Sequence, residues 1–375
     1  MADETRMAER EADGAVDRGT DAAWASGADG AVDRRTDAAR ASGALETSNP
    51  VSSGTAPLLD PVPSADAQAS SGVVVVGSMM TDLTAVAERL PRRGETVMGR
   101  QFSLVSGGKG SNQAAMAARM EVPTWMVGCV GSDVFHQVVL DSLRGFSVRT
   151  DHVHVLDGEH TGIAHIRVDA TGDNDIVIIP NANLKTSPRH VDEFFASGIA
   201  AKVLLLQLET PIETALYAAR EAKARGVQVI LNPAPAAPLP DEVFEVIDFI
   251  TPNETEAGVL TGVEVTGVDS AVAAARTLCA RGAKHAIVTL GGLGVVHVTG
   301  EEAHHYPTFA VSVVDTTAAG DAFTGAFGSA LASSRSVRDA IEVGLAAGAL
   351  TVTKLGAQSS LPTRAEVEAL IARGR

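Results

Sequence analysis

Short apolar runs alternate with amphipathic stretches along most of this chain. The apolar runs lie at 73–76, 124–130, 203–206, 227–231 and 286–290. Runs of this length that are apolar throughout and rich in β-branched residues are typical of strands buried on both faces. The stretches between them, such as 211–225 and 269–281, repeat apolar residues at helical spacing. Strands that alternate with helices predict right-handed βαβ units and a parallel sheet.

Two segments, 94–105 and 162–179, do not fit this alternation. The second contains HIRVDATGDNDIVII, which predicts a hairpin with a polar turn. We expect both segments to leave the main sheet and form a small antiparallel flap. Ligands of open α/β sheets bind at the carboxyl ends of the strands, so a flap at that edge would act as a lid.

Residues 1–71 differ from the rest in composition. They hold 13 acidic and 6 basic residues among Ala, Gly, Ser, Thr and Pro, which predicts a disordered acidic tail. The stretch ADGAVDRGTDAAWASG at 12–27 returns as ADGAVDRRTDAARASG at 28–43. Two copies of 16 residues are too few and too short for a solenoid. We therefore favour a duplication within a disordered tail over a partner-binding repeat. The tail has neither the apolar core of a secretory signal nor the composition of a transit peptide.

The composition of the whole chain excludes several classes of protein. The net charge of −16 opposes binding to nucleic acids and anionic membranes. Cys129 and Cys279 match no zinc or redox spacing, so we expect a reduced intracellular protein without a structural metal. The most apolar late stretch, 343–353, is too short to cross a bilayer. We expect a soluble cytoplasmic protein, also nuclear if its source is eukaryotic.

The segment DTTAAGDAF at 315–323 is the strongest local signal for chemistry. An apolar helical run follows it, so its small residues open a helix and Asp321 lies on the first turn. Bare amides at a helix N-terminus suit an anion such as a phosphoryl group in transfer. Asp321 beside that anion could accept a proton from an attacking hydroxyl. The alternative is an acid that only stabilises its helix.

A second motif, GGKGSN at 107–112, lies between a strand pattern and a helix at 113–120. Its glycines allow the backbone to approach a ligand closely, and Lys109 and Asn112 offer hydrogen-bond donors. The motif is not a Walker A loop, which requires a different spacing. Alone, it would be interpreted as a tight turn from a strand to a helix.

Taken together, these motifs make residues 73–373 resemble the ribokinase subgroup of the PfkB carbohydrate kinases. The resemblance rests on VVVVGSMMTDL (73–83), RLPRRGETVMGRQF (89–102), SGGKGSNQAA (106–115), LQLETP (206–211), LNPAPA (231–236), TPNETEAGVLTG (251–262), VTLGGLGV (288–295), DTTAAGDAF (315–323) and GAQSSLP (356–362). It implies a ribokinase-like three-layer α/β/α domain over 72–375 with a mostly parallel sheet. It also implies a small antiparallel β lid from about 82–106 and 160–180. The implied activity is ATP-dependent phosphorylation of D-ribose at O5.

The resemblance also implies roles for individual residues. Asp321 would be the general base, and the amides of Ala318, Ala319 and Gly320 would form an anion hole, with Ala318 standing where the family usually has Gly. Sugar binding is implied for Met80, Thr81, Asp82, Gly108, Lys109, Gly110, Ser111, Asn112, Glu209 and Asp321. Nucleotide binding is implied for Asn253, Glu256, Thr289, Leu290, Gly291, Gly292, Leu293, Gly294, Gly320, Asp321 and Leu345. Asn253 and Glu256 would organise Mg²⁺ through water. A monovalent cation, K⁺, is implied among Asp315, Thr317, Thr351, Lys354, Gly356 and Ser360, with Lys354 offering only its carbonyl.

Several of these residues also have purely structural interpretations. Asp82 alone would be a turn residue and Glu209 a capping acid. The segment 289–294 would be an ordinary βα connection, and the loop at Asp315 would be closed by the Asp315 side chain.

Met80 departs from the pattern of many bacterial members, which have Asn there to hold the sugar. Methionine donates no hydrogen bond and prefers apolar contacts, so it should tolerate a sugar that lacks one hydroxyl. Animal-type ribokinases and bacterial deoxyribokinases resemble this variant. We expect ribose as the substrate, with 2-deoxyribose as the competitor. In the alternative, Met80 only packs against the lid.

Two other functions compete with a sugar kinase. A nucleoside kinase should stack an aromatic ring on the base, yet apart from Phe102 the sugar motifs contain no aromatic residue. A catalytically silent sugar sensor need not keep Asp321, Asn253 and Glu256 together. As partners we expect a pentose and ATP, neither nucleic acid nor membrane, and a second copy of the chain paired through the exposed edges of the lid.

Overall fold

The computed structural model describes residues 72–374. The predicted tail over 1–71, with its duplication, lies outside the described residues. No helix within 72–374 is long and apolar enough to span a bilayer.

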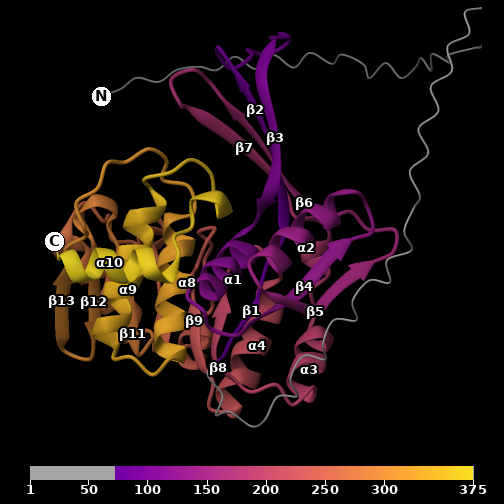
Figure 1. Ribbon diagram of the computed structural model, residues 1–375. Helices are drawn as coiled ribbons and strands as arrows, with labels where there is room; N and C mark the ends of the chain where they lie inside the picture. Colours follow the sequence, from indigo (N-terminus) through magenta and orange to yellow (C-terminus); the bar gives the residue numbers. More distant parts are fainter. Residues whose placement is uncertain (1–71, 375) are drawn as a thin grey trace, which may run out of the picture. The chain divides into compact units, whose positions relative to one another are not determined.

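A nine-stranded sheet forms the centre of the described region, in the order β13-β12-β11-β10-β9-β8-β1-β4-β5 (Figure 1). Its strands are β1 (Gly72–Val76), β4 (Thr124–Gly131), β5 (Arg149–Leu156), β8 (Ala201–Leu206), β9 (Gln228–Leu231), β10 (Phe249–Ile250), β11 (His285–Thr289), β12 (Val295–Thr299) and β13 (Glu302–Tyr306). Neighbouring strands are parallel from β5 to β11, and only β12 and β13 are antiparallel. The mostly parallel sheet predicted from the alternating pattern is confirmed.

Helices cover both faces of this sheet. One layer holds α1 (Lys109–Arg119), α2 (Phe135–Gly145), α8 (Ala319–Ala332), α9 (Val337–Thr351) and α10 (Arg364–Arg373). The other holds α3 (Pro188–Ala196), α4 (Ile212–Ala224), α5 (Asp241–Val246), α6 (Glu254–Thr261) and α7 (Val268–Ala280). Alternate residues of β1 divide between the layers: Val73 and Val75 pack with the first, Val74 and Val76 with the second. This alternation explains why buried strands are apolar at every position.

A second sheet, which we call the lid, projects from the body of the molecule (Figure 1). Its strands run in the order β3 (Gly99–Gly107), β2 (Met80–Ala87), β6 (Gly162–Val168) and β7 (Asn174–Ile179). The predicted small antiparallel flap is present as a separate sheet, with one difference: its two hairpins meet through a parallel pair, β2 and β6. These strands follow β1 and β5, which run in the same direction, so both leave the main sheet the same way. Each hairpin, β2–β3 and β6–β7, is antiparallel as predicted.

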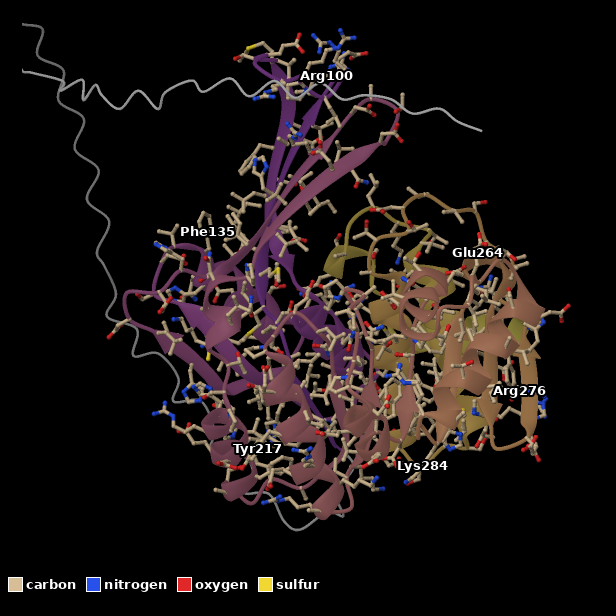
Figure 2. All side chains as sticks on the ribbon, turned by 180° about the vertical axis from the view of Figure 1, so that it is seen from behind. Arg100, Phe135, Tyr217, Glu264, Arg276 and Lys284 are labelled. Carbon is tan, nitrogen blue, oxygen red and sulfur yellow. The ribbon has the colours of Figure 1, made fainter. Side chains whose placement is uncertain are left out.

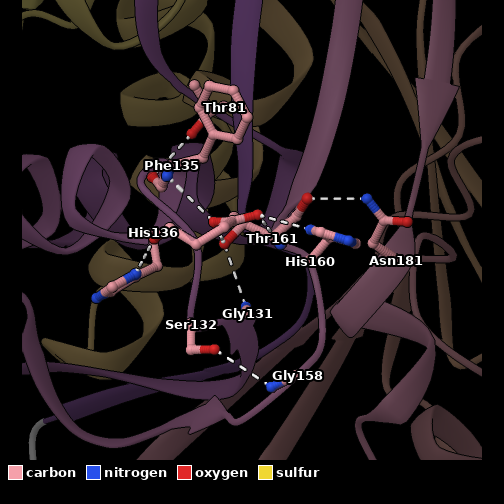
Figure 3. Close-up of polar contacts among 10 residues, drawn as sticks. Thr81, Gly131, Ser132, Phe135, His136, Gly158, His160, Thr161 and Asn181 are labelled. Atoms are coloured by element: carbon pink, nitrogen blue, oxygen red, sulfur yellow. Dashed lines mark hydrogen bonds and ion pairs between the residues drawn. The ribbon is translucent and has the colours of Figure 1, made fainter. Parts of the chain in front are cut away.

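Polar contacts fasten the base of the lid to the body (Figure 3). The Thr81 hydroxyl at the start of β2 donates to the carbonyl of Phe135 over 3.1 Å. The Asp133 carboxylate accepts hydrogen bonds from the amide and hydroxyl of Thr161, just before β6, at 2.8 and 2.7 Å. The loop between β4 and α2, together with the first residue of α2, therefore holds both parallel strands of the lid. At the far end of the lid, Arg100 pairs with Glu88 (Figure 2).

Three short 3₁₀ turns complete the described elements: η1 (Asn181–Lys185), η2 (Gly291–Leu293) and η3 (Gln358–Ser360). The Asn183 side chain in η1 accepts from the amide of Met79 and donates to its carbonyl, at 2.8 and 2.9 Å. This clamp fixes the backbone immediately before Met80.

Candidate active site

A polar cleft of about 550 Å³ lies at the carboxyl ends of the central strands. Its walls contain Lys109, Asn232, Ala234, Thr251, Asn253, Glu256, Thr289, Thr316, Ala318, Ala319, Gly320 and Asp321. The DTTAAGDAF segment, the Gly-Gly-Lys turn and the Asn-x-x-Glu motif are thus brought together from three distant parts of the chain. This position is where open α/β sheets bind their ligands.

The Asp321 carboxylate is held by two amide side chains of α1. The Asn112 amide donates to Oδ2 and the Gln113 amide donates to Oδ1, each over 3.0 Å. Asp321 is only 6% exposed, and burial of a carboxylate is favourable only where such donors satisfy it. The Gln358 amide in turn donates to Asn112 Oδ1 over 3.2 Å. Gln113 and Gln358 were not singled out in the sequence.

The N-terminus of α8 presents backbone rather than side-chain groups to the cleft. Its N-cap, Ala318, has a left-handed φ of 60° and carries no oxygen that could cap the helix amides. The first turn is built from Ala319, Gly320 and Asp321. Amides left without a side-chain cap favour an anion, so the predicted anion hole has the right local structure.

Three charged side chains, Asp82, Lys109 and Glu209, form what we call the sugar side of the site. The Lys109 amide donates to Glu209 Oε2 over 2.9 Å, and the Ser78 hydroxyl donates to the same oxygen over 2.5 Å. Burial, followed by the charges of Glu209 and Asp321, raises the pKa of Asp82 to about 7. The charges of Asp321, Glu209 and Glu256 raise the pKa of Lys109 against its own desolvation. Five ionisable groups, Asp82, Lys109, Glu209, Glu256 and Asp321, are therefore linked by these charge interactions.

Glycine is required at both positions before Lys109, because groups of β2 lie very close to the backbone there. A side chain at Gly107 would overlap the Asp82 carboxylate. Gly108 has φ of 88°, and a Cβ there would lie 2.9 Å from the amide nitrogen of Met80. Met80 and Asp82 share one face of β2, because side chains alternate along a strand.

Other residues of the predicted sugar set have structural contacts. Thr81 points to the opposite face of β2 and its side chain is bonded to Phe135. Gly110 packs against the Ser78 backbone, where a Cβ would lie 2.5 Å from the nitrogen. The buried Ser111 hydroxyl donates to the carbonyl of Gly107. Gly110 and Ser111 thus shape the turn, and the hydroxyls of Thr81 and Ser111 are both used in contacts within the protein.

A second, largely apolar cleft of about 990 Å³ adjoins the first, and we call it the nucleotide side. Thr289, Gly291, Gly292, Gly294 and Leu345 of the predicted nucleotide set line it. Leu290 is buried and Leu293 is half exposed, and neither lines the cleft. Phe323 also lines the cleft; it lies in the DTTAAGDAF segment, but no role was assigned to it. Further lining residues were missed in the sequence because they belong to no motif: Phe309, Val311, Val313, Gly344 and Gly348.

The segment 289–294 is not the βα connection considered as its alternative interpretation. It joins β11 to the antiparallel strand β12 through η2. Gly291 and Gly294 have φ of 48° and 95°, and a side chain at Gly294 would overlap the carbonyl of Tyr306. Glycine at these positions lets the turn form one wall of the apolar cleft.

Asn253 and Glu256 form a reciprocal cap on α6. The Glu256 amide donates to Asn253 Oδ1 over 2.8 Å, and the Asn253 amide donates to Glu256 Oε2 over 2.9 Å. Both residues line the polar cleft, and burial raises the pKa of Glu256 in spite of the Asn253 hydrogen bond. A carboxylate in this position suits Mg²⁺ held through water. Within 72–374, no cluster of three or more His, Cys, Asp or Glu side chains is placed to hold a metal directly.

The residues predicted to surround K⁺ lie in three connected segments. The Asp315 carboxylate accepts from the amide and hydroxyl of Thr317 and from the amide of Gly356, at 2.9, 2.6 and 2.8 Å. Burial acts to raise the pKa of Asp315, but these hydrogen bonds outweigh it and lower the pKa. Thr351 and Ser360 are buried, and their hydroxyls donate to carbonyls of their own turns. The Lys354 ammonium pairs with Glu366. The groups are oxygen-rich and fit a hard monovalent cation, and Asp315 also closes the loop.

Comparison with known proteins identifies the family. The model of the pfkB family carbohydrate kinases matches residues 70–364. A ribokinase from Haemophilus influenzae is 41% identical over 294 residues, which are 78% of this chain and 96% of that protein. A deoxyribokinase from Salmonella typhi is 37% identical over 292 residues, which are 78% of this chain and 95% of that protein. The solved structure of Arabidopsis thaliana ribokinase complexed with ribose and ATP has a TM-score of 0.75 and 34% identity, and the match covers 81% of this chain and 99% of that one. The chain belongs to the PfkB family of carbohydrate kinases.

Proposed function

We propose that this protein is a ribokinase, which transfers the γ-phosphoryl group of ATP to O5 of D-ribose. The observation that carries the proposal is the position of Asp321 at the junction of the two clefts. Ala319 and Gly320, which precede it, line both the polar and the apolar cleft. A base at that junction can reach a sugar on one side and a nucleotide phosphate on the other. The relatives named ribokinase, including one complexed with ribose and ATP, support this choice of substrates.

Each part of the site has a role in this reaction. Asp82, Lys109 and Glu209 bind the sugar hydroxyls, and Asp321 takes the proton of the attacking O5 hydroxyl. The amides at the start of α8 offset the charge that develops on the phosphoryl group. Asn253 and Glu256 would hold Mg²⁺, which neutralises nucleotide phosphate charge when it is bound. The lid, formed from about 82–106 and 160–180 of the kinase domain, closes over the sugar and excludes water.

A coupled kinase assay over ribose, 2-deoxyribose, fructose and adenosine tests the proposal. We expect ATP-dependent turnover with ribose as the preferred substrate. Turnover of adenosine or fructose well above that of ribose would contradict it. The absence of any turnover, together with intact ribose binding, would instead favour a sugar sensor.

Deoxyribokinase is the second candidate, and Met80 favours it. Met80 is buried at the start of β2 beside the sugar side, and it offers no hydrogen bond to a sugar hydroxyl. The deoxyribokinase relative is nearly as similar as the ribokinases. A kcat/KM for 2-deoxyribose far below that for ribose would exclude this candidate.

Potassium activation is part of the proposal, with Asp315, Thr317, Thr351, Lys354, Gly356 and Ser360 around the ion. The cation would order the segment between Asp315 and α8, which carries the anion hole. Removal of K⁺ in sodium-free buffer should therefore lower kcat, and restoring it should recover the rate. An unchanged rate would make this assignment wrong.

We also propose that two copies pair through the lid. β3 and β7 are its edge strands, and both expose large apolar side chains. In β7 the consecutive residues Ile176, Val177, Ile178 and Ile179 are 42–60% exposed, so both of its faces are apolar. An apolar sheet edge of this kind favours pairing with another strand. Light scattering should give the mass of a dimer, and Val177→Lys should shift it towards a monomer; a monomeric parent protein would contradict the pairing.

ATP use favours the cytoplasm as the location of this enzyme. Fractionation of the source cells would check this, and recovery outside the cytoplasm would contradict it.

A further inference from the structure

A chain of buried amide side chains runs beneath the polar cleft and ends on Asp321. The Gln113 amide nitrogen donates to Asp321 Oδ1 over 3.0 Å and lies 3.2 Å from Asn232 Oδ1. The Gln113 oxygen accepts from the Gln207 amide over 2.6 Å. Asn232 is fixed in its turn, because its own amide donates to the carbonyl of Thr251 over 2.9 Å. Gln113 and Gln207 are fully buried.

The strands of the main sheet supply the outer members of this chain. Gln207, Asn232 and Thr251 each follow directly after the last residue of β8, β9 or β10, which are neighbours in the sheet. Gln113 lies on α1 and projects towards them. These hydrogen bonds therefore connect the carboxyl ends of three adjacent strands to one oxygen of Asp321.

These contacts determine which way the Gln113 amide faces. An amide group has one accepting and one donating end, and an ionised carboxylate can only accept. The donating end of Gln113 must therefore face Asp321, and its oxygen then faces the Gln207 amide. The Gln207 oxygen is packed so closely against Gly77 that a side chain at residue 77 would overlap it. This close packing also confines the Gln207 side chain, which is the outer end of the hydrogen-bonded series.

We infer that Gln113 is a positioning residue for the general base, acting through the Gln207–Gln113–Asp321 chain. It holds Oδ1, while Asn112 holds Oδ2, so the plane of the carboxylate is fixed before the sugar binds. Asn112 is also a predicted sugar ligand, whereas Gln113 has no exposed surface with which to meet a substrate. Preorganisation of this kind reduces the rearrangement needed during proton transfer. The inference rests on the proposed role of Asp321.

Substitution of Gln113 by Met and by Glu tests this. Gln113→Met keeps the length of the side chain but removes its three hydrogen bonds, to Asp321, to Asn232 and from Gln207. We expect kcat to fall about 10- to 100-fold, with both KM values within about threefold. Gln113→Glu places a second carboxylate against Asp321. Two carboxylates at this distance share a proton, so the acidic limb of the kcat profile should move upward by about one pH unit or more.

Ser329→Ala is the matched control. Ser329 is a buried polar residue on α8, and its hydroxyl donates to the Gly325 carbonyl rather than to Asp321. We expect it to change the thermal midpoint without moving the pH profile. If Gln113 had only a structural role, both Gln113 variants would likewise change the thermal midpoint without moving the pH profile. That result would overturn the inference.

Misfolding of the Gln113 variants and failure of the proposed function can both be distinguished from failure of the inference. If the Gln113 variants do not fold, Gln207→Met removes only the outer link, and it should lower kcat in the same direction but by less; an unchanged kcat would overturn the inference. Failure of the proposed function looks different, because the unmodified protein would then phosphorylate no pentose. An active parent, an inactive Asp321→Asn variant and unaffected Gln113 variants would reject the inference alone.

Discussion

In the proposed ribokinase, the sugar side and the nucleotide side of the site recognise their ligands by different means. The sugar side gathers charged side chains, Asp82, Lys109 and Glu209, so closely that their pKa values shift. The nucleotide side is lined by glycines and apolar residues and offers backbone amides. Sugar affinity that depends on closely spaced charged side chains should change with pH. Nucleotide affinity that depends on backbone amides should change when a side chain is added beside them. Substitutions on the two sides should therefore have different effects.

Asp321→Asn should have the largest effect, because Asp321 lies where the two sides meet. Asparagine cannot accept the O5 proton, so we expect kcat to fall about 10²- to 10⁴-fold. Ribose affinity, measured by calorimetry, should change little, since Asp82, Lys109 and Glu209 remain. Activity within tenfold of the parent would show that another group is the base.

Ribose binding at the sugar side should weaken as the pH falls. Asp82 accepts sugar hydroxyls best when ionised, and its pKa is raised to about 7. The KM for ribose should therefore rise as the pH falls below about 7, by up to about tenfold per pH unit. Asp82→Asn should raise KM and remove this dependence. Asp151→Asn, on an exposed part of β5, is the control and should keep it. A pH-independent KM in the parent would contradict the crowded-charge interpretation.

ATP binding at the nucleotide side should weaken when a single methyl group is added there. A Cβ added at Gly320 meets no atom within 4 Å, so Gly320→Ala should fold normally. The methyl group would occupy space beside the anion hole, and we expect the KM for ATP to rise about tenfold at every pH. Gly145→Ala at the end of α2 is the matched control, because its Cβ also meets nothing within 4 Å. An unchanged ATP KM for Gly320→Ala would show that the phosphates do not approach this amide.

The sequence predicted the groups that belong to motifs, but it did not reveal how distant groups combine. Apolar runs located the strands, and the motifs located Asp321, Lys109 and Glu209. Gln113, Gln207 and Asn232 each lie inside a motif, but their roles were missed because about a hundred residues separate consecutive members, so no spacing shows that they meet. The parallel pairing of β2 and β6 was missed for a related reason, since it depends on the directions of β1 and β5. The apolar wall at Phe309 and Val311 lies in an irregular segment without periodicity.

The smallest effect concerns discrimination between two sugars, which differ by one hydroxyl. Met80 lies opposite Gly107 in β3 and Gly162 in β6, so neither neighbouring strand places a side chain directly beside it. Met80→Asn would supply a donor that ribose can satisfy better than 2-deoxyribose. We expect the ratio of kcat/KM for the two sugars to move towards ribose by about fivefold, the value of one modest hydrogen bond of about 1 kcal/mol. Met80→Leu is the matched apolar control and should leave the ratio within about twofold. If Asn and Leu changed the ratio alike, Met80 would act by packing alone, and sugar discrimination would have to come from Asp82 and Asn112.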